Sequence, residues 1–131
     1  MISSLLVLLT LAAPAIDQDA ADASQPQAAL ATAIPHALAL IESKQYEKFI
    51  RQYAVPSQLK KVLKQKTLDE IVRGFAKDHA ARILLILKQI QEKQPSINTA
   101  GTVAEYPTDV KNFSRKKVVF EKIGGLWYLQ N

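Results

Sequence analysis

Apolar residues recur at helical spacing through the first two thirds of the chain. Ala28–Ile34 is a possible helix start, which Pro35 either interrupts or restarts because proline suits a first helical turn but not an interior. From His36 to Tyr53 the apolar side chains form one broad stripe, which predicts a helix that Ser43–Gln45 can divide into two. Pro56 then begins a short helix to about Lys66. Its inward residues are predicted to be Leu59, Val62 and Leu63.

The longest predicted helix begins with a capping box at Thr67–Glu70. A threonine cap followed three residues later by glutamate lets each side chain satisfy a free backbone donor near the other. The apolar period continues to about Gln94, and Pro95 stops it. The inward stripe of this helix is predicted to be Leu68, Ile71, Val72, Phe75, His79, Ile83, Ile86, Leu87 and Ile90.

After Ser96 the period changes to two, which is typical of strands. Ile97–Tyr106 is predicted as one strand with a bend at Gly101, and Pro107–Ser114 as a loop or a short edge strand. The segment from Lys116 to Asn131 contains two strand-like runs around Gly124-Gly125, the pair that a two-residue hairpin turn favours.

The two-residue turn fixes the register of the last hairpin. It pairs Ile123 with Leu126, Lys122 with Trp127, Glu121 with Tyr128 and Phe120 with Leu129. Strand alternation then assigns Val118, Phe120, Lys122, Trp127 and Leu129 to one face. This face is predicted to lie against the longest helix, so Trp127 is expected to anchor the core. The other face is mixed, which suits a partly solvated sheet surface.

These elements predict an α+β domain in which N-terminal helices pack on a small C-terminal antiparallel sheet of three to four strands. Residues 28–131 are assigned to this one domain. Residues 1–15 are predicted to be a secretory signal peptide, since a short apolar run precedes the small residues Ala13 and Ala15. Residues 16–27 are acidic and polar, which predicts a flexible leader. The expected location is therefore secreted or periplasmic, with an uncleaved anchor as the alternative.

The charge and the cysteine content of the chain limit the functions that the sequence allows. The 131-residue chain has no cysteine, which excludes disulfides, thiolate metal sites and a cysteine nucleophile. All 17 of its Lys and Arg residues lie from Lys44 onward. This basic surface either serves solubility or attracts an anionic polymer or membrane surface. The cations that could form such a face are Lys60, Lys61, Lys64, Lys66, Arg115, Lys116 and Lys117. Aromatic residues are not interleaved with them, so nucleic acid is not an expected partner.

The closing hairpin, Phe120 to Leu129, also carries a family resemblance. Its phenylalanine, lysine, glycine turn and Trp-Tyr-Leu ending resemble the last hairpin of secreted bacterial domains of the nuclear transport factor 2-like, cystatin-like superfamily. Tyr46–Ile50 followed by Val55-Pro56 is similar to uncharacterised envelope proteins of that kind. The resemblance implies a cone-shaped sheet curled around a helix, often with a pocket, and a homodimer through the sheet face. It says nothing specific about activity.

His79 is the titratable residue of most interest, because it lies on the apolar stripe of the longest helix. It is interpreted either as a buried structural histidine or as a general base in a pocket. His36 is expected to be exposed at a helix start. The candidate ligand-binding residues are His79, Tyr46, Phe75 and Trp127. No catalytic set, metal site or cofactor motif is predicted.

The sequence therefore predicts an exported binding or interaction domain without catalytic activity. Its partner would be a small ligand or an envelope protein. The alternatives are an isomerase-like pocket enzyme that uses His79, with a tyrosine hydroxyl as donor, and a protein that binds anionic polymers.

Overall fold

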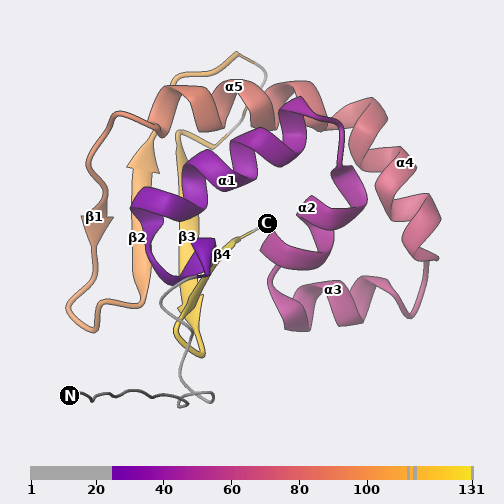
Figure 1. Ribbon diagram of the computed structural model, residues 1–131, viewed down its shortest axis with the longest axis horizontal. Coiled ribbons are helices and arrows are strands. Elements are labelled where there is room, and N and C mark those ends of the chain that lie inside the picture. Colours follow the sequence, from indigo (N-terminus) through magenta and orange to yellow (C-terminus); the bar gives the residue numbers. More distant parts are fainter. Residues whose placement is uncertain (1–24, 112, 114, 131) are drawn as a thin grey trace, which may run out of the picture.

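The computed structural model describes residues 25–111, 113 and 115–130. Helices come first along the chain and an antiparallel sheet follows, so the protein has an α+β fold (Figure 1). The helical elements are the 3-10 turn η2 (Pro26–Ala28), α1 (Leu30–Glu42), α2 (Tyr46–Tyr53), α3 (Pro56–Val62), α4 (Leu68–Asp78) and α5 (Ala80–Ile90). The strands are β1 (Ser96–Ile97), β2 (Val103–Pro107), β3 (Lys117–Ile123) and β4 (Leu126–Leu129). The predicted signal peptide lies outside the described residues.

The four strands form an antiparallel meander in the order β1-β2-β3-β4. The hairpin between β3 and β4 has the predicted register, with Ile123 opposite Leu126 and Lys122 opposite Trp127. Gly124 and Gly125 have φ values of 58° and 82°, the left-handed conformations that this tight turn requires. The pairing of β2 with β3 continues the same inner face through Ala104 and Tyr106.

The prediction of one bent strand over Ile97–Tyr106 was wrong, because the segment forms two strands. β1 pairs with β2 through Ser96 and Glu105. Between the two strands, Gly101 has φ 74°. The side-chain oxygen Oδ1 of Asn98 accepts hydrogen bonds from the backbone N–H groups of Thr102 and Val103. An asparagine that satisfies two backbone donors stabilises a reversal of the chain rather than a bend in a strand.

The helix predicted over His36–Tyr53 is divided into α1 and α2, as the sequence allowed. α1 begins at Leu30, before the predicted start at His36. α1 ends at Glu42, and Lys44, with φ 61°, separates it from α2. Pro35 lies inside α1 without interrupting it. The carbonyl of Ala31 loses its intrahelical donor there, but both Ala31 and Pro35 lie on the exposed side, where water can replace that donor.

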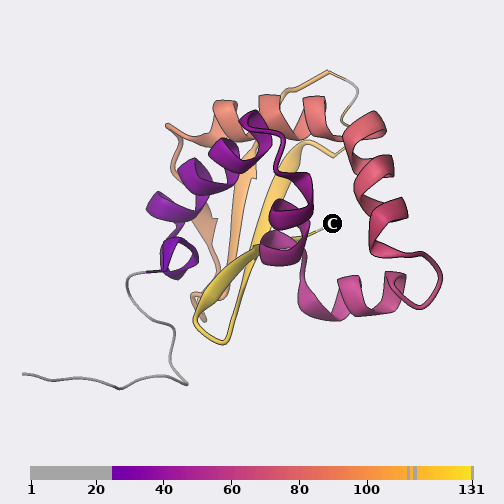
Figure 2. The ribbon, with the colours of Figure 1, turned by 45° about the vertical axis from the view of Figure 1, so that its right-hand side comes forward.

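The longest predicted helix is in fact two helices, α4 and α5, which meet at His79. His79 has φ −128° and ψ −26°, outside helical geometry, and it serves as the C-cap of α4 and the N-cap of α5. α5 packs on α1, whereas α4 packs on α2. One straight helix could not cover both neighbours, so the tertiary packing overrides the local preference for a continuous helix. Figure 2 shows α4 turning away from the line of α5.

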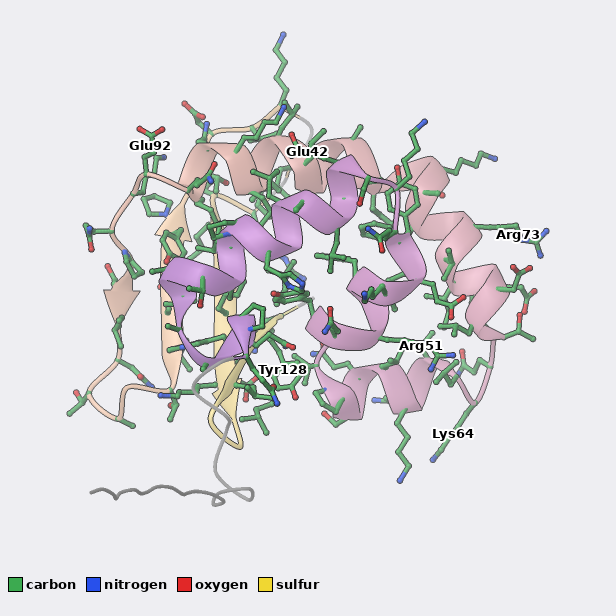
Figure 3. The ribbon with its side chains drawn as sticks, in the orientation of Figure 1. Glu42, Arg51, Lys64, Arg73, Glu92 and Tyr128 are labelled. Carbon is green, nitrogen blue, oxygen red and sulfur yellow. The ribbon has the colours of Figure 1, made fainter. Side chains whose placement is uncertain are left out.

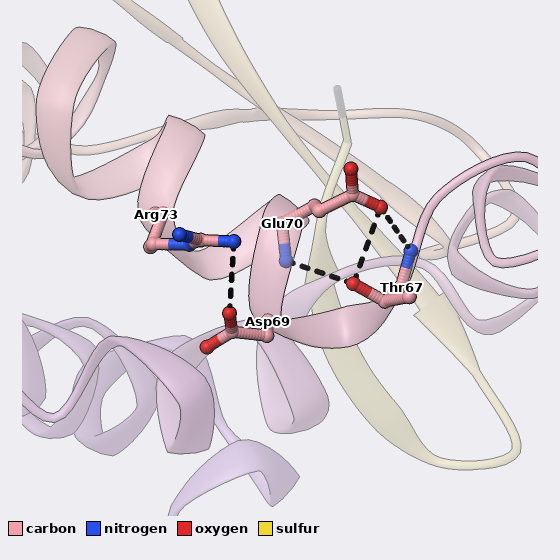
Figure 4. Close-up of polar contacts among 4 residues, drawn as sticks. All are labelled: Thr67, Asp69, Glu70 and Arg73. Atoms are coloured by element: carbon pink, nitrogen blue, oxygen red, sulfur yellow. Dashed lines mark hydrogen bonds and ion pairs between the residues drawn. The ribbon is translucent and has the colours of Figure 1, made fainter.

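The capping box at the start of α4 is confirmed (Figure 4). The Glu70 backbone N–H donates to Thr67 Oγ1 at 3.1 Å, and the Thr67 backbone N–H donates to Glu70 Oε1 at 2.9 Å. The backbone N–H of Thr67, and after it the Thr67 hydroxyl, donate to the Glu70 carboxylate and lower the pKa of that carboxyl. The Glu70 carboxylate therefore stabilises the N-terminus of α4.

The core lies between the inner face of the sheet and the helices α1, α2 and α5. Among its fully buried side chains are Tyr53, Ile86, Leu87, Ile90 and Phe120. Trp127 is also buried, at 6% exposure, which confirms it as a core residue. Lys122, beside it on the same face, places its Nζ atom 5.8 Å from the centre of the indole ring.

The end of the predicted flexible leader is part of the fold. Residues 16–24 lie outside the described residues, but Gln27 is buried and belongs to η2. Its Nε2 donates to the backbone carbonyl of Gln52 at 2.6 Å and to that of Trp127 at 3.0 Å. One amide group thus joins the first described element to the end of α2 and to β4.

Candidate functional site

A hollow of the described structure lies between the helices α2, α3 and α4 and the sheet. Its volume is about 690 Å³, and we call it the main cavity. It reaches the end of β4 at Leu129 and the start of β3 at Val118. Figure 2 shows α3 and α4 standing away from the strands on this side of the molecule.

The position of α3 explains why the cavity exists. The sequence predicted that Leu59, Val62 and Leu63 would face inward, but Leu59 is only half-buried and the other two are 39% and 44% exposed. α3 is a short helix of seven residues with no buried residue. α3 therefore connects α2 to α4 without filling the space between itself and the sheet.

The wall of the main cavity is mainly apolar and aromatic. Phe49, Tyr53 and Val118 are buried at its base, and Ile71 and Phe75 are half-buried on the α4 side. The remaining large apolar lining residues are Ile50, Leu59, Val62, Ile83, Phe113, Val119 and Leu129. Such a lining favours an apolar ligand, and the volume is within the usual range for small-molecule sites.

A row of aromatic rings runs from the cavity wall into the core. Tyr46 packs edge-on against Phe75 at 5.7 Å between ring centres, and Phe75 stacks with Phe49 at 5.4 Å. Phe49 stacks in turn with Tyr53 at 5.6 Å. Aromatic pairs in these geometries stabilise one another by about 0.5–1.5 kcal/mol beyond the burial of their area, so the wall is firmly held.

Gly74 opens the α4 side of the cavity. It lies inside the helix, where glycine costs about 0.5–1 kcal/mol relative to alanine. A glycine in a helix often permits close approach of another element, but a Cβ built on Gly74 would have no atom within 4 Å. The missing side chain therefore leaves space in the cavity instead of accommodating a packed neighbour.

His79 is exposed, so its predicted position on a buried stripe was wrong. It lies at the cavity edge between α4 and α5, 6.3 Å from the ring of Phe75 between centres. Its Nδ1 atom is 2.8 Å from a guanidinium nitrogen of Arg82. Because that nitrogen can only donate, Nδ1 accepts, and the neutral ring carries its proton on Nε2.

The four predicted ligand-binding residues do not form one site. His79 and Phe75 line the main cavity, and Tyr46 packs behind Phe75 without lining it. Trp127 is in the core and does not line the cavity. The prediction that the hairpin face with Trp127 lies against the apolar stripe with His79 assumed that α4 and α5 form one straight helix.

A second histidine was misjudged from the sequence. His36 was expected to be exposed, but it is half-buried, and its Nδ1 lies 2.7 Å from the hydroxyl of Tyr53. That hydroxyl donates to the carbonyl of Ala33 at 3.1 Å, so His36 Nδ1–H is the donor toward Tyr53. Burial first, and then Lys48, lower the pKa of His36, while burial raises the pKa of Tyr53.

This network bears on the pocket-enzyme hypothesis, which requires a tyrosine hydroxyl beside His79. Tyr53 lines the main cavity, but its hydroxyl is bonded to His36 and Ala33. Within residues 25–111, 113 and 115–130, no hydrogen bond joins His79 to a tyrosine. The same residues contain no group of three or more His, Asp or Glu side chains placed to hold a metal ion.

A second, more open hollow of about 430 Å³ lies on the other side of α3, and we call it the outer groove. Gln27, Arg51, Lys60, Leu63 and Tyr128 are among its lining residues. Figure 3 labels Arg51 and Tyr128, which both line this groove, and shows Lys64 and Arg73 pointing outward from the molecule.

The comparisons with known proteins give no assignment. No family model, no curated protein and no solved structure matches the chain. The resemblance of the closing hairpin to the cystatin-like superfamily therefore stays a prediction. Among the described residues, no helix is long and apolar enough to cross a membrane.

Proposed function

We propose that this domain is a non-catalytic binding protein that holds an apolar ligand in the main cavity. The observation that carries the proposal is the open space beside Gly74, within a cavity of about 690 Å³ whose base is aromatic. A glycine that weakens its helix without serving a packing contact is accounted for by a ligand that occupies this space. The half-buried apolar lining residues would be covered when the ligand binds.

The test uses a neutral fluorescent probe, N-phenyl-1-naphthylamine, whose emission rises in apolar surroundings. We expect saturable binding to the wild-type protein. Gly74→Leu should weaken binding at least tenfold, because its side chain would project into the open space. Leucine is also a better helix former than glycine, so the variant should fold.

Gly74→Ala is the matched control. It removes the same helix-interior glycine but adds only one methyl group, so probe binding should persist and the free energy of unfolding should rise by about 0.5–1 kcal/mol. The proposal is wrong if the probe does not bind the wild type, or if Gly74→Leu binds it as tightly as Gly74→Ala does.

The proposal includes export, which rests on the apolar run and small residues of positions 1–15. When the full-length chain is expressed in a bacterium with two membranes, the protein should be recovered from the periplasm. Its mass should be that of a chain that begins at Ile16. Recovery of the full-length mass from the membrane fraction would instead support the uncleaved anchor.

Two further predictions from the sequence concern larger partners. A homodimer through the outer face of β3 and β4 would appear as a doubled mass in sedimentation at micromolar concentration. Binding of anionic polymer through α3 and the turn that follows it would be ruled out if Lys60→Ala, Lys61→Ala and Lys64→Ala together left retention on a heparin column unchanged.

A further inference from the structure

Helix α3 is anchored to the rest of the domain at its N-terminal end. Val55, its N-cap residue, is buried at 4% exposure, and the preceding Ala54 forms a parallel β-bridge with Leu129 of β4. Exposure then rises along the helix, since Leu59 is half-buried and Val62 is 39% exposed. The C-terminal end of α3 is therefore the end that the domain does not cover.

The backbone hydrogen bonds make α3 and the turn after it one unit. The N–H of Leu59 donates to the carbonyl of Val55, and the N–H groups of Gln65 and Lys66 both donate to the carbonyl of Val62. In the described part of the chain, no backbone hydrogen bond joins residues 56–66 to another helix or to a strand. Changes in the backbone dihedral angles of Val55 and Lys66 would therefore swing α3 without breaking these bonds.

Hollow space borders α3 on two sides. Gln58 and Val62 line the main cavity, Lys60 and Leu63 line the outer groove, and Leu59 lines both. Figures 1 and 2 show α3 at the edge of the molecule, beside the end of α2 and the segment that leads to α4. The helix thus has room to swing toward the sheet, and the outer groove would widen as the main cavity narrowed.

The exposed apolar side chain at the free end of α3 favours movement toward the main cavity once a ligand is present. Val62 lines the cavity while it is still 39% exposed, and Ile71 and Phe75 of α4 are half-buried in the cavity wall. An apolar ligand in this space would let all three side chains lose contact with water, which is the favourable term of apolar burial. The ligand would then shift the position of α3 because it contacts the closed state more extensively.

We propose that α3 is a lid that pivots at Val55 and Lys66 and closes over an apolar ligand in the main cavity, with Leu59 and Val62 as the side chains that cover the ligand. This inference rests on the proposed function and adds how the site opens and closes. The helix has seven residues. A helix of this size is about 10 Å long, so a rotation of about 30° about one end moves the other end by about 5 Å. A ligand under the closed lid leaves only when the lid opens.

The movement can be measured between two spin labels, because the chain has no cysteine and introduced cysteines are labelled without background. Lys61 is exposed on α3 and lines neither hollow, and Ala39 is exposed on α1, which packs on α5. In Lys61→Cys/Ala39→Cys, double electron–electron resonance should give a broad distance distribution for the free protein. Saturating N-phenyl-1-naphthylamine should narrow the distribution and shift its mean by roughly 3–5 Å.

Ala76→Cys/Ala39→Cys is the matched control. Ala76 is exposed on α4, which packs on α2 and is not part of the lid. The distance between these two labels should change by less than about 1 Å when the probe binds, as in a preformed site. Equal shifts in the two labelled pairs would mean that the domain contracts as a whole, and the lid inference would then be wrong.

A pair of substitutions at the free end of α3 tests which side chain covers the ligand. Val62 lines the main cavity and its neighbour Leu63 lines the outer groove, although their exposed fractions are similar at 39% and 44%. Val62→Asn should raise the dissociation rate of the probe about fivefold, because the closed lid loses an apolar contact. Leu63→Asn should change this rate by less than about twofold. Both side chains are exposed, so both variants should fold.

The failures of the two proposals can be told apart. If the probe binds while the distribution between positions 61 and 39 stays the same, the lid inference is wrong and the apolar binding site stands. The same conclusion follows if Val62→Asn releases the probe as slowly as Leu63→Asn does. If the probe does not bind the wild-type protein, the proposed function fails and the lid inference fails with it.

Discussion

Gln27 shows that a single polar side chain can hold distant elements together even though the polar composition of its segment predicts a flexible leader. It lies in a polar stretch that resembles a flexible leader, yet it is buried and its Nε2 donates to two backbone carbonyls. The acceptors, Gln52 and Trp127, lie 25 and 100 residues away in the sequence. No local pattern could have predicted partners at such separations, since they exist only once α2 and β4 are in place.

Replacing Gln27 with alanine should destabilise the domain by about 1–3 kcal/mol, because two carbonyls lose their donor and one of these bonds is buried. Urea denaturation would measure the change. Gln25→Ala is the control, since Gln25 is exposed and bonds through its backbone only, and it should stay within about 0.5 kcal/mol of the wild type. Equal effects of both substitutions would contradict the assignment.

His36 should make the stability of the domain depend on pH. Its pKa in the folded state is lowered from 6.5, so the unfolded chain takes up a proton more readily. The stabilisation is fully present above about pH 6.5 and is lost as the pH falls toward the folded pKa. Urea denaturation between pH 7.5 and 5 should show this slope, and His36→Gln should flatten it. His79→Gln should retain it, because His79 is exposed.

At the scale of elements, the sequence predicted those features that neighbouring residues determine. The capping box of α4 and the β3–β4 register depend on contacts within a few positions, and both are confirmed. The break at His79 was missed because no glycine or proline marks it; it arises from packing of α4 and α5 on different partners. The Asn98–Gly101 turn did have a local signal, an asparagine close before a glycine, which was interpreted as a bend.

The glycine turn provides a test at this scale. Gly124 has φ 58° and no atom within 4 Å of a built Cβ, so a substitution there would be strained by the backbone conformation alone. Gly124→Ala should cost about 1–2 kcal/mol. Gly124→Asn should cost less, because asparagine tolerates the left-handed region. Thermal denaturation of the pair would check the order, and an alanine variant as stable as the asparagine variant would contradict it.

At the scale of the whole molecule, the main cavity was beyond sequence reasoning. Its residues come mainly from α2, α3, α4, the start of α5 and the open end of the β3–β4 hairpin. The sequence identified Phe75 and His79 as members, but it could not show that α3 stands away from the sheet. Apolar spacing alone placed Val62 and Leu63 inward, because periodicity reports an apolar face and not what covers it.

A ligand that occupies the cavity should stabilise the whole fold by mass action. With N-phenyl-1-naphthylamine at about 100 times its dissociation constant, the free energy of unfolding should rise by about 2.7 kcal/mol. A thermal shift assay would detect this as an increase in Tm. Gly74→Leu should abolish the increase, whereas Gly74→Ala should retain it. An equal increase in both variants would place the bound ligand outside the main cavity.

The bonds of Gln27 also have a consequence for the order of folding. Protein synthesis proceeds from the N-terminus, so η2, α1 and α2 are made before β3 and β4, against which their apolar faces pack. Ile34, Ile41 and Phe49 are buried in the finished domain but have no sheet to cover them until the last hairpin forms. Contacts of such long sequence separation slow folding and expose apolar surface meanwhile. The helices of the nascent chain therefore expose these apolar faces until the last hairpin has been made.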